Sequence, residues 1–158
     1  MDSYALLFLA LPILSFLLQI SFGKRLGRNA HYISLILIGM MLAQSLYIFF
    51  SSMHHTDPFV DSVVSWFTTS GMFSFEVGLK IDQIASIMLL IVSLISFLVH
   101  LYSTEYMKDD PRYTRYFAYL GLFTFSMNGI VLAPSLIMMY VFWELVGLSS
   151  YLLIGFWF

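Results

Sequence analysis

The residue of this chain best suited to chemistry is Glu144, which lies near the middle of an apolar stretch from Ser135 to Phe158. At about 1.5 Å per residue, a helix of that length crosses the ~30 Å hydrocarbon layer of a bilayer. An ionisable side chain at the centre of such a helix is costly, at about 2.5–3.5 kcal/mol for Asp on insertion scales. We interpret Glu144 as a proton-relay carboxyl; a protonated or hydrogen-bonded Glu that joins helices is the structural alternative.

The residues around Glu144 predict the direction in which the carboxyl points. Tyr140 and Leu148 lie four residues before and after it, and Gly147 lies three residues after it. Residues at these spacings share one face of a helix. A glycine beside the carboxyl allows another helix, or a file of water, to approach closely. We therefore expect Glu144 to face the interior of the helix assembly.

Two further polar residues lie towards the two ends of one expected helix. Asp82 directly precedes an apolar run, and N-capping accounts for its position. His100 lies near the far end of that run, within reach of Tyr102 or Glu105. We interpret it as a satisfied interfacial histidine, with proton delivery as the alternative. A haem pair with His31 is disfavoured because His31 falls in an expected loop.

The composition indicates an integral membrane protein. Of the 158 residues, 60% are hydrophobic and 10% are charged, whereas soluble domains carry about 25% charged residues. The absence of cysteine excludes disulfides, a thiolate metal site and a cysteine nucleophile. The net charge of −2 and the absence of a Lys/Arg cluster argue against a nucleic-acid partner. No nucleotide-binding or hydrolase motif is present, so we expect no metal or cofactor in this chain.

Five membrane-spanning helices are expected to position Glu144, which makes the fold class an all-α polytopic membrane protein. Pro12 lies inside the first helix, where neighbouring helices can satisfy the carbonyl that it frees. The loop Gly23–Asn29 carries three basic residues, so the positive-inside rule places it in the cytoplasm and the N-terminus outside. A second, mixed-charge cytoplasmic loop is expected over Ser103–Arg115. The apolar segments are about Tyr4–Phe22, Tyr32–Phe50, Asp82–Leu101, Tyr116–Leu132 and Ser135–Phe158.

The segment between the second and third helices predicts a short extracytoplasmic β-hairpin. Val63–Thr69 and Gly71–Val77 are rich in β-formers on either side of Ser70-Gly71, a pair that favours a tight turn. This divides the chain into residues 1–80, with two helices and the hairpin, and residues 81–158, with three helices. No polar flank follows the last apolar stretch, and we take the sequence to be a piece of a longer protein.

Two segments of the chain resemble a known family. One is Trp143–Trp157, with the sequence WELVGLSSYLLIGFW. The other runs from Asp82 to Tyr119 and carries the spaced pattern Asp82, Ser86, Met88, His100, Tyr102-Ser103, Tyr106-Met107 and Tyr116-Phe117-Ala118-Tyr119. Together they resemble the N-terminal part of chain 5 (subunit L) of the proton-pumping NADH:quinone oxidoreductase, respiratory complex I. Residues 81–158 would then begin the first inverted repeat of an antiporter-like region.

The resemblance implies a mechanism. In that family the Glu matching Glu144 pairs with a Lys on a later, broken helix, and shifts in the pair move a proton across the membrane. Asp82 and His100 match motif positions without an assigned role. NADH, flavin, iron–sulfur clusters and quinone belong to other subunits. The implied partners are the other membrane subunits of complex I and the lipid bilayer, and we expect a bacterial inner membrane as the location.

Two other functions stay open at this point. The large subunit of multi-subunit sodium/proton antiporters is similar throughout, and Trp143-Glu144-Leu145 suits it, whereas Val146-Gly147 favours complex I. A truncated copy that packs against partner helices without transporting ions is the second alternative. A sodium-coupled pH gradient without NADH would distinguish the antiporter.

Overall fold

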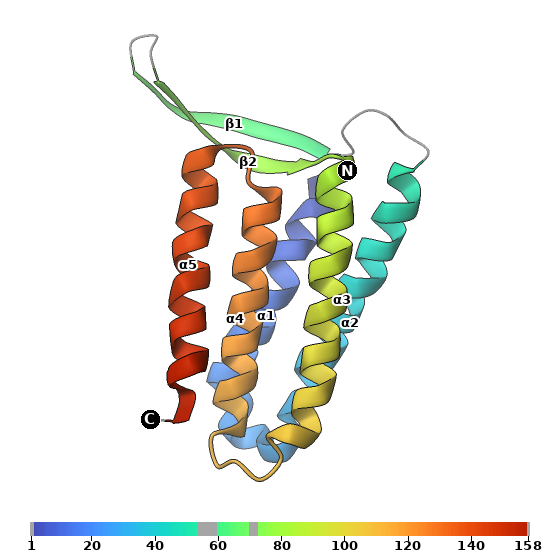
Figure 1. Cartoon of the computed structure of the whole chain (residues 1–158), viewed down its shortest axis with the longest axis vertical. Coiled ribbons are helices and arrows are strands. Elements are labelled where there is room, and N and C mark those ends of the chain that lie inside the picture. Colours follow the sequence, from blue (N-terminus) through green and yellow to red (C-terminus); the bar gives the residue numbers. More distant parts are fainter. Residues whose placement is uncertain (1, 54–59, 70–72, 158) are drawn as a thin grey trace.

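Five α-helices and one pair of strands make up the computed structural model, which describes residues 2–53, 60–69 and 73–157 (Figure 1). The helices lie side by side and alternate in direction. The strands lie across one end of the bundle, and the C-terminus lies at the other end. The helices are α1 Asp2–Leu26, α2 Ala30–Ser52, α3 Gln83–Tyr106, α4 Tyr113–Leu132 and α5 Leu136–Ile154, which continues into a 3-10 turn over Gly155–Trp157.

The central helix of the bundle is α4, which contacts all four other helices. Its buried residues include Gly121, Thr124, Ser126 and Asn128. Four helical segments of the described chain are long and apolar enough to cross a membrane: Ala5–Gly23, Ala30–Ser52, Gln83–Tyr106 and Leu136–Trp157. The prediction of five apolar spans is thus confirmed for four. The exception is α4, whose neighbours are helices and which therefore accommodates small and polar side chains.

The junction between α1 and α2 differs from the predicted loop. The first helix continues through Gly23 to Leu26, and only the 3-10 turn Gly27–Asn29 separates it from α2. Gly27 adopts a φ of 56°, the left-handed conformation that favours glycine past a helix end. Gly23 instead allows close packing, because an added Cβ would lie 2.8 Å from Thr114 Cβ on α4. His31 lies in the first turn of α2, so its placement in a loop was wrong.

The predicted loop Ser103–Arg115 is also shorter in the structure. The third helix extends to Tyr106, and α4 begins at Tyr113, so that both ends of the expected loop are helical. Lys108 and Glu105 form an ion pair at the end of α3. Asp110 accepts a hydrogen bond from the backbone N–H of Arg112 at 2.6 Å, which fixes the chain just before α4 begins.

Two antiparallel strands, β1 Val60–Thr69 and β2 Phe73–Ile81, follow α2. Their pairing runs from Val60 opposite Ile81 to Thr69 opposite Phe73, with a register shift between Ser65 and Phe67. Both strands are longer than the sequence predicts, and the expected turn at Ser70-Gly71 lies outside the described residues. Leu79 and Ile81 are buried in the main apolar core, so the end of β2 is anchored on the bundle.

Side-chain hydrogen bonds connect neighbouring helices along the bundle. Small hydroxyl side chains are effective in this role because they satisfy each other without separating the helices. Gln19 adds a bond from α1 to the backbone oxygen of Ala30 at 2.6 Å. The hydroxyl pairs are Ser15–Ser34 at 2.8 Å, Ser45–Ser93 at 2.6 Å, Ser52–Ser86 at 2.9 Å and Ser96–Thr124 at 2.7 Å.

Pro12 is accommodated in α1 by a side chain from α4. Proline has no N–H, so the carbonyl of Phe8, four residues earlier, lacks its usual helical donor. The amide nitrogen of Asn128 donates to that carbonyl at 2.9 Å. The two helices approach closely here, because a Cβ added at Gly121 would lie 3.2 Å from the Pro12 oxygen. The expectation that a neighbouring helix satisfies the freed carbonyl is confirmed.

Candidate functional site

Glu144 lies well inside α5, the helix that follows the short connection from α4. Ser135 caps this helix, with its hydroxyl accepting a hydrogen bond from the backbone N–H of Met138 at 3.4 Å. Glu144 comes nine residues after the cap, which at 1.5 Å per residue places it about 13 Å along the helix axis. The candidate span Leu136–Trp157 has 22 residues. The carboxyl therefore lies close to the middle of this span.

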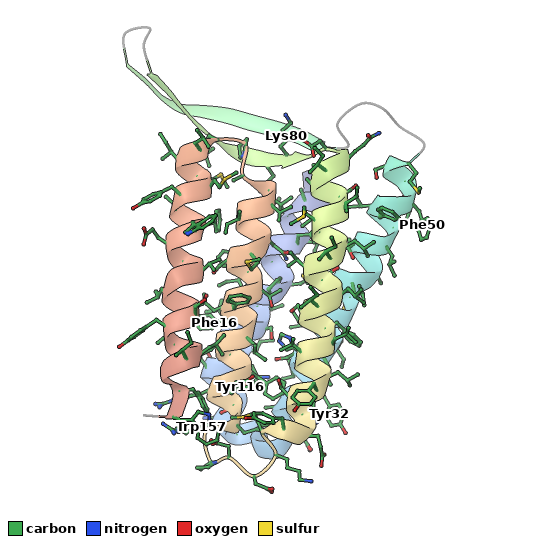
Figure 2. All side chains as sticks on the ribbon, in the orientation of Figure 1. Phe16, Tyr32, Phe50, Lys80, Tyr116 and Trp157 are labelled. Atoms are coloured by element: carbon green, nitrogen blue, oxygen red, sulfur yellow. The ribbon has the colours of Figure 1, made fainter. Side chains whose placement is uncertain are left out.

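The carboxyl faces away from the other four helices. Glu144 is exposed, Tyr140 is 63% exposed and Tyr151 is 72% exposed. A Cβ added at Gly147 would meet no atom within 4 Å, so the space beside the carboxyl is open in the described chain. The Tyr140 side chain lies beside the Glu144 carboxyl on this face of α5. Side chains project from this outward face of α5 in Figure 2.

The prediction that Glu144 faces the interior was therefore wrong for the described chain. The opposite face of α5 packs on α4, where the ring of Phe142 covers Gly129 and Ser149 is buried. Because α5 is apolar on nearly every side, periodicity alone does not indicate which face packs. Gly147 predicts that another helix can approach this face, but it does not predict which helix that is.

His100 is fully buried near the end of α3. The sequence had suggested Tyr102 or Glu105 as its partner, but the ring bonds to Ser96 instead. Its Nδ1 lies 2.8 Å from the Ser96 carbonyl oxygen, to which it donates. Its ring lies 6.0 Å from the ring of Phe117 on α4. The other ring nitrogen, Nε2, has no hydrogen-bond partner among the described residues. His31 also contacts Phe117, at 6.4 Å between ring centroids.

Asp82 caps α3 at the end of the bundle where the strands lie. Its Oδ1 accepts a hydrogen bond from the backbone N–H of Ala85 at 2.8 Å. The N-cap geometry indicated by the sequence is observed, with an extended backbone at Asp82. This contact satisfies one of the free N–H groups in the first turn of the helix.

The three predicted site residues lie apart in the described chain. Asp82 is at one end of α3 and His100 is near the other, whereas Glu144 lies on α5, with α4 between the two helices (Figure 1). Within residues 2–53, 60–69 and 73–157, no group of three or more His, Asp or Glu residues is placed to hold a metal ion. The carboxyl of Glu144 is therefore the chemical group around which a site can form.

Sequence reasoning missed Asn128 and the serines on α3. The signal for the serines was present, because Ser86 and Ser93 are seven residues apart and so are their partners Ser52 and Ser45. A seven-residue repeat of small polar residues indicates one helix face packed on another. Asn128 had no such signal, since its partner is a backbone carbonyl on a helix far away in sequence.

Comparison with known proteins shows what this chain is similar to. Residues 66–117 match the family model described as NADH-Ubiquinone oxidoreductase (complex I), chain 5 N-terminus. The chloroplast NAD(P)H-quinone oxidoreductase subunit 5 of Chlorokybus atmophyticus is 46% identical over 80% of this chain and 19% of its own length. The same subunit from Draba nemorosa is 42% identical over 99% of this chain and 21% of its own length.

A solved structure supports the fold. The membrane-bound sulfane sulfur reductase, an archaeal respiratory membrane complex, contains a chain that matches 93% of this one with a TM-score of 0.77. The sequences are 18% identical and 29% of that chain is covered, so the likeness concerns the arrangement of helices. The relatives and the apolar helices identify an integral membrane protein. The chain is similar to the N-terminal part of chain 5 of complex I, and it spans about a fifth of the length of the curated relatives it matches.

Proposed function

We propose that this chain forms part of the proton-translocating membrane subunit of an NADH:quinone oxidoreductase, with Glu144 as its proton relay. The observation that carries the proposal is a carboxyl on the outward face of an apolar span. The chain is also 42% identical, over 99% of its own residues, to a subunit of a quinone oxidoreductase. A carboxyl facing lipid alone would carry the full insertion cost, so we propose that the rest of the protein covers it.

The covering segment is proposed to bring a lysine to Glu144. An ammonium group within ~4–6 Å favours the ionised carboxylate, whereas burial without that charge favours the protonated acid. Movement of the lysine toward and away from Glu144 would therefore release and load one proton in each cycle. The Tyr140 hydroxyl is placed to orient the carboxyl, since the two side chains are neighbours on the same face of α5.

The other predicted residues receive supporting roles in this proposal. Asp82 fixes the start of α3 through its cap. His100 is held by Ser96 in the bundle and is a secondary candidate for proton delivery, because its Nε2 has no partner among the described residues. We place electron transfer and its cofactors in other subunits, and we place residues 81–158 at the start of the antiporter-like region.

The distribution of charge suggests an orientation. Six of the seven Lys and Arg residues lie at the junctions α1–α2 and α3–α4, at the same end of the bundle. Under the positive-inside rule that end is cytoplasmic or its equivalent, which puts the N-terminus and the β1–β2 pair on the opposite side. The bacterial inner membrane stays a prediction from the sequence, and the two relatives described above are chloroplast proteins.

The experiment that tests the proposal is isolation of the complex that contains this chain from its native membrane, followed by reconstitution in liposomes. We expect flavin and iron–sulfur subunits to copurify, and NADH with a quinone to generate a sodium-independent pH gradient. A gradient that requires sodium and no NADH would establish the antiporter instead. Copurification without any ion gradient would establish a scaffold.

A further inference from the structure

A groove runs between the first turns of α4 and the last turns of α5. Its volume is about 670 Å³. The groove is lined by two basic residues and by aromatic and glycine residues, notably Arg112, Arg115, Tyr119, Gly147, Gly155 and Phe156. Apart from their contribution to the orientation in the membrane, the two arginines have no role in the function proposed above.

The arginines form a cationic end to the groove. Arg112 lies over the ring of Phe156, with 5.1 Å between the guanidinium carbon and the ring centroid. The backbone of Arg112 is fixed by Asp110, and Arg115 follows within the same turn of α4. Guanidinium groups bind phosphate through paired hydrogen bonds, and two of them in one groove recognise a dianionic or monoanionic phosphate.

The remaining wall of the groove is mostly apolar and open, with Ser150 and Tyr151 as its hydroxyl-bearing residues. Leu152 and Ile154 line it, and Ile154 is 80% exposed. An added Cβ at Gly147 or Gly155 would meet no atom within 4 Å, so the absence of side chains at these two positions leaves space along α5. This wall can accept a hydrocarbon chain but offers few partners to a soluble anion.

The groove also lies at the depth of a membrane surface. Tyr116 and Trp157 lie at the same end of the bundle, opposite Lys80 (Figure 2). Trp157 is 64% exposed, and exposed aromatic residues at the ends of apolar helices lie at the headgroup level of a bilayer. The guanidinium groups are therefore level with lipid phosphates, while Gly147 and Leu152 lie deeper.

We propose that this groove binds an anionic phospholipid, with its phosphate on Arg112 and Arg115 and an acyl chain along α5. Charge complementarity selects the headgroup, and the apolar wall selects a lipid over a free phosphate. The proposal requires the helices to cross a membrane but does not require that Glu144 carries protons.

The test is native mass spectrometry of the intact complex in mild detergent, with phosphatidylglycerol or phosphatidylcholine added. We expect selective retention of phosphatidylglycerol, and a loss of about tenfold in the double variant Arg112→Gln/Arg115→Gln. The matched control Arg25→Gln/Lys108→Gln removes the same charge at the same end of the bundle and should retain the lipid. Gly155→Leu fills the groove without changing charge and should also release it.

Three outcomes would overturn the proposal. One is equal retention of the two lipids by the unmodified complex. Another is unchanged retention of phosphatidylglycerol in both the arginine variant and Gly155→Leu. The third is complete displacement by inorganic phosphate at equal concentration, which would identify a free-anion site. Loss of lipid in the arginine variant, with retention in its control, would support the proposal whether or not the complex pumps protons.

Discussion

At the scale of single residues, Asn128 and Pro12 depend on each other across two helices. Replacement of Asn128 by Ala leaves the Phe8 carbonyl without a donor in a buried position. We expect Asn128→Ala to lower the free energy of unfolding by about 1–3 kcal/mol, measured by steric trapping or denaturation in detergent. In a Pro12→Ala background the backbone N–H returns, so the same substitution should lower it by clearly less.

A matched control for this prediction is Ser126→Ala on the same helix. Ser126 is also fully buried, but its hydroxyl donates only to Leu122, one turn earlier in α4. We expect Ser126→Ala to lower the free energy of unfolding by less than Asn128→Ala does, and by the same amount whether residue 12 is Pro or Ala. Equal losses from Asn128→Ala with and without Pro12 would show that the amide does not act through the Phe8 carbonyl.

Asp82 provides a second prediction at this scale. Asp82→Ala removes the cap of α3 and should lower the free energy of unfolding by about 0.5–2 kcal/mol, whereas Asp82→Asn keeps an acceptor for the Ala85 N–H. Both variants should pump protons once folded, as measured in liposomes. Folded Asp82→Asn protein that fails to pump would mean that the charge of Asp82 takes part in transport.

At the scale of elements, the contact between α4 and α5 depends on Gly129. A Cβ added there would collide with the ring of Phe142. We expect Gly129→Ala to destabilise the protein by about 1–3 kcal/mol in the same unfolding assays, because the ring must move in a packed interface. Gly39→Ala is the control, since a Cβ added there makes an ordinary contact with the Phe97 ring at 3.4 Å. A combined Gly129→Ala/Phe142→Ala variant should recover part of the lost stability. If it recovers none, the destabilisation does not come from the clash between the added Cβ and the Phe142 ring.

The elements also show what sequence can and cannot predict here. Helix positions, the Asp82 cap and the place of the strands follow from local patterns of apolar, polar and turn residues. The face of α5 that carries Glu144 does not, because an apolar helix gives no amphipathic signal for the side that packs. The end of the first helix was also missed, since Gly23 is a packing contact with Thr114 and not a stop.

At the scale of the whole molecule, the two ends of the bundle should lie on opposite sides of the membrane. Lys80 is exposed at the end of the bundle where the strands lie, and Lys108 is exposed in the connection between α3 and α4 at the other end. The chain contains no cysteine. We expect Lys80→Cys and Lys108→Cys to react with a membrane-impermeant maleimide from opposite sides of sealed vesicles. Lys108→Cys should react from the cytoplasmic or equivalent side. Labelling of both variants from one side would contradict the arrangement of helices in the membrane.

The most direct test of the central claim is proton pumping by the intact complex carrying Glu144→Gln. Glu105→Gln is the control, because it removes an equal charge from an exposed ion pair at the end of α3. With a pH-sensitive dye inside liposomes and NADH oxidation followed in parallel, we predict that Glu144→Gln assembles but pumps far fewer protons for each NADH oxidised. The control should pump normally. An unchanged ratio of protons to NADH in assembled Glu144→Gln complex would contradict the assignment of Glu144 as the relay.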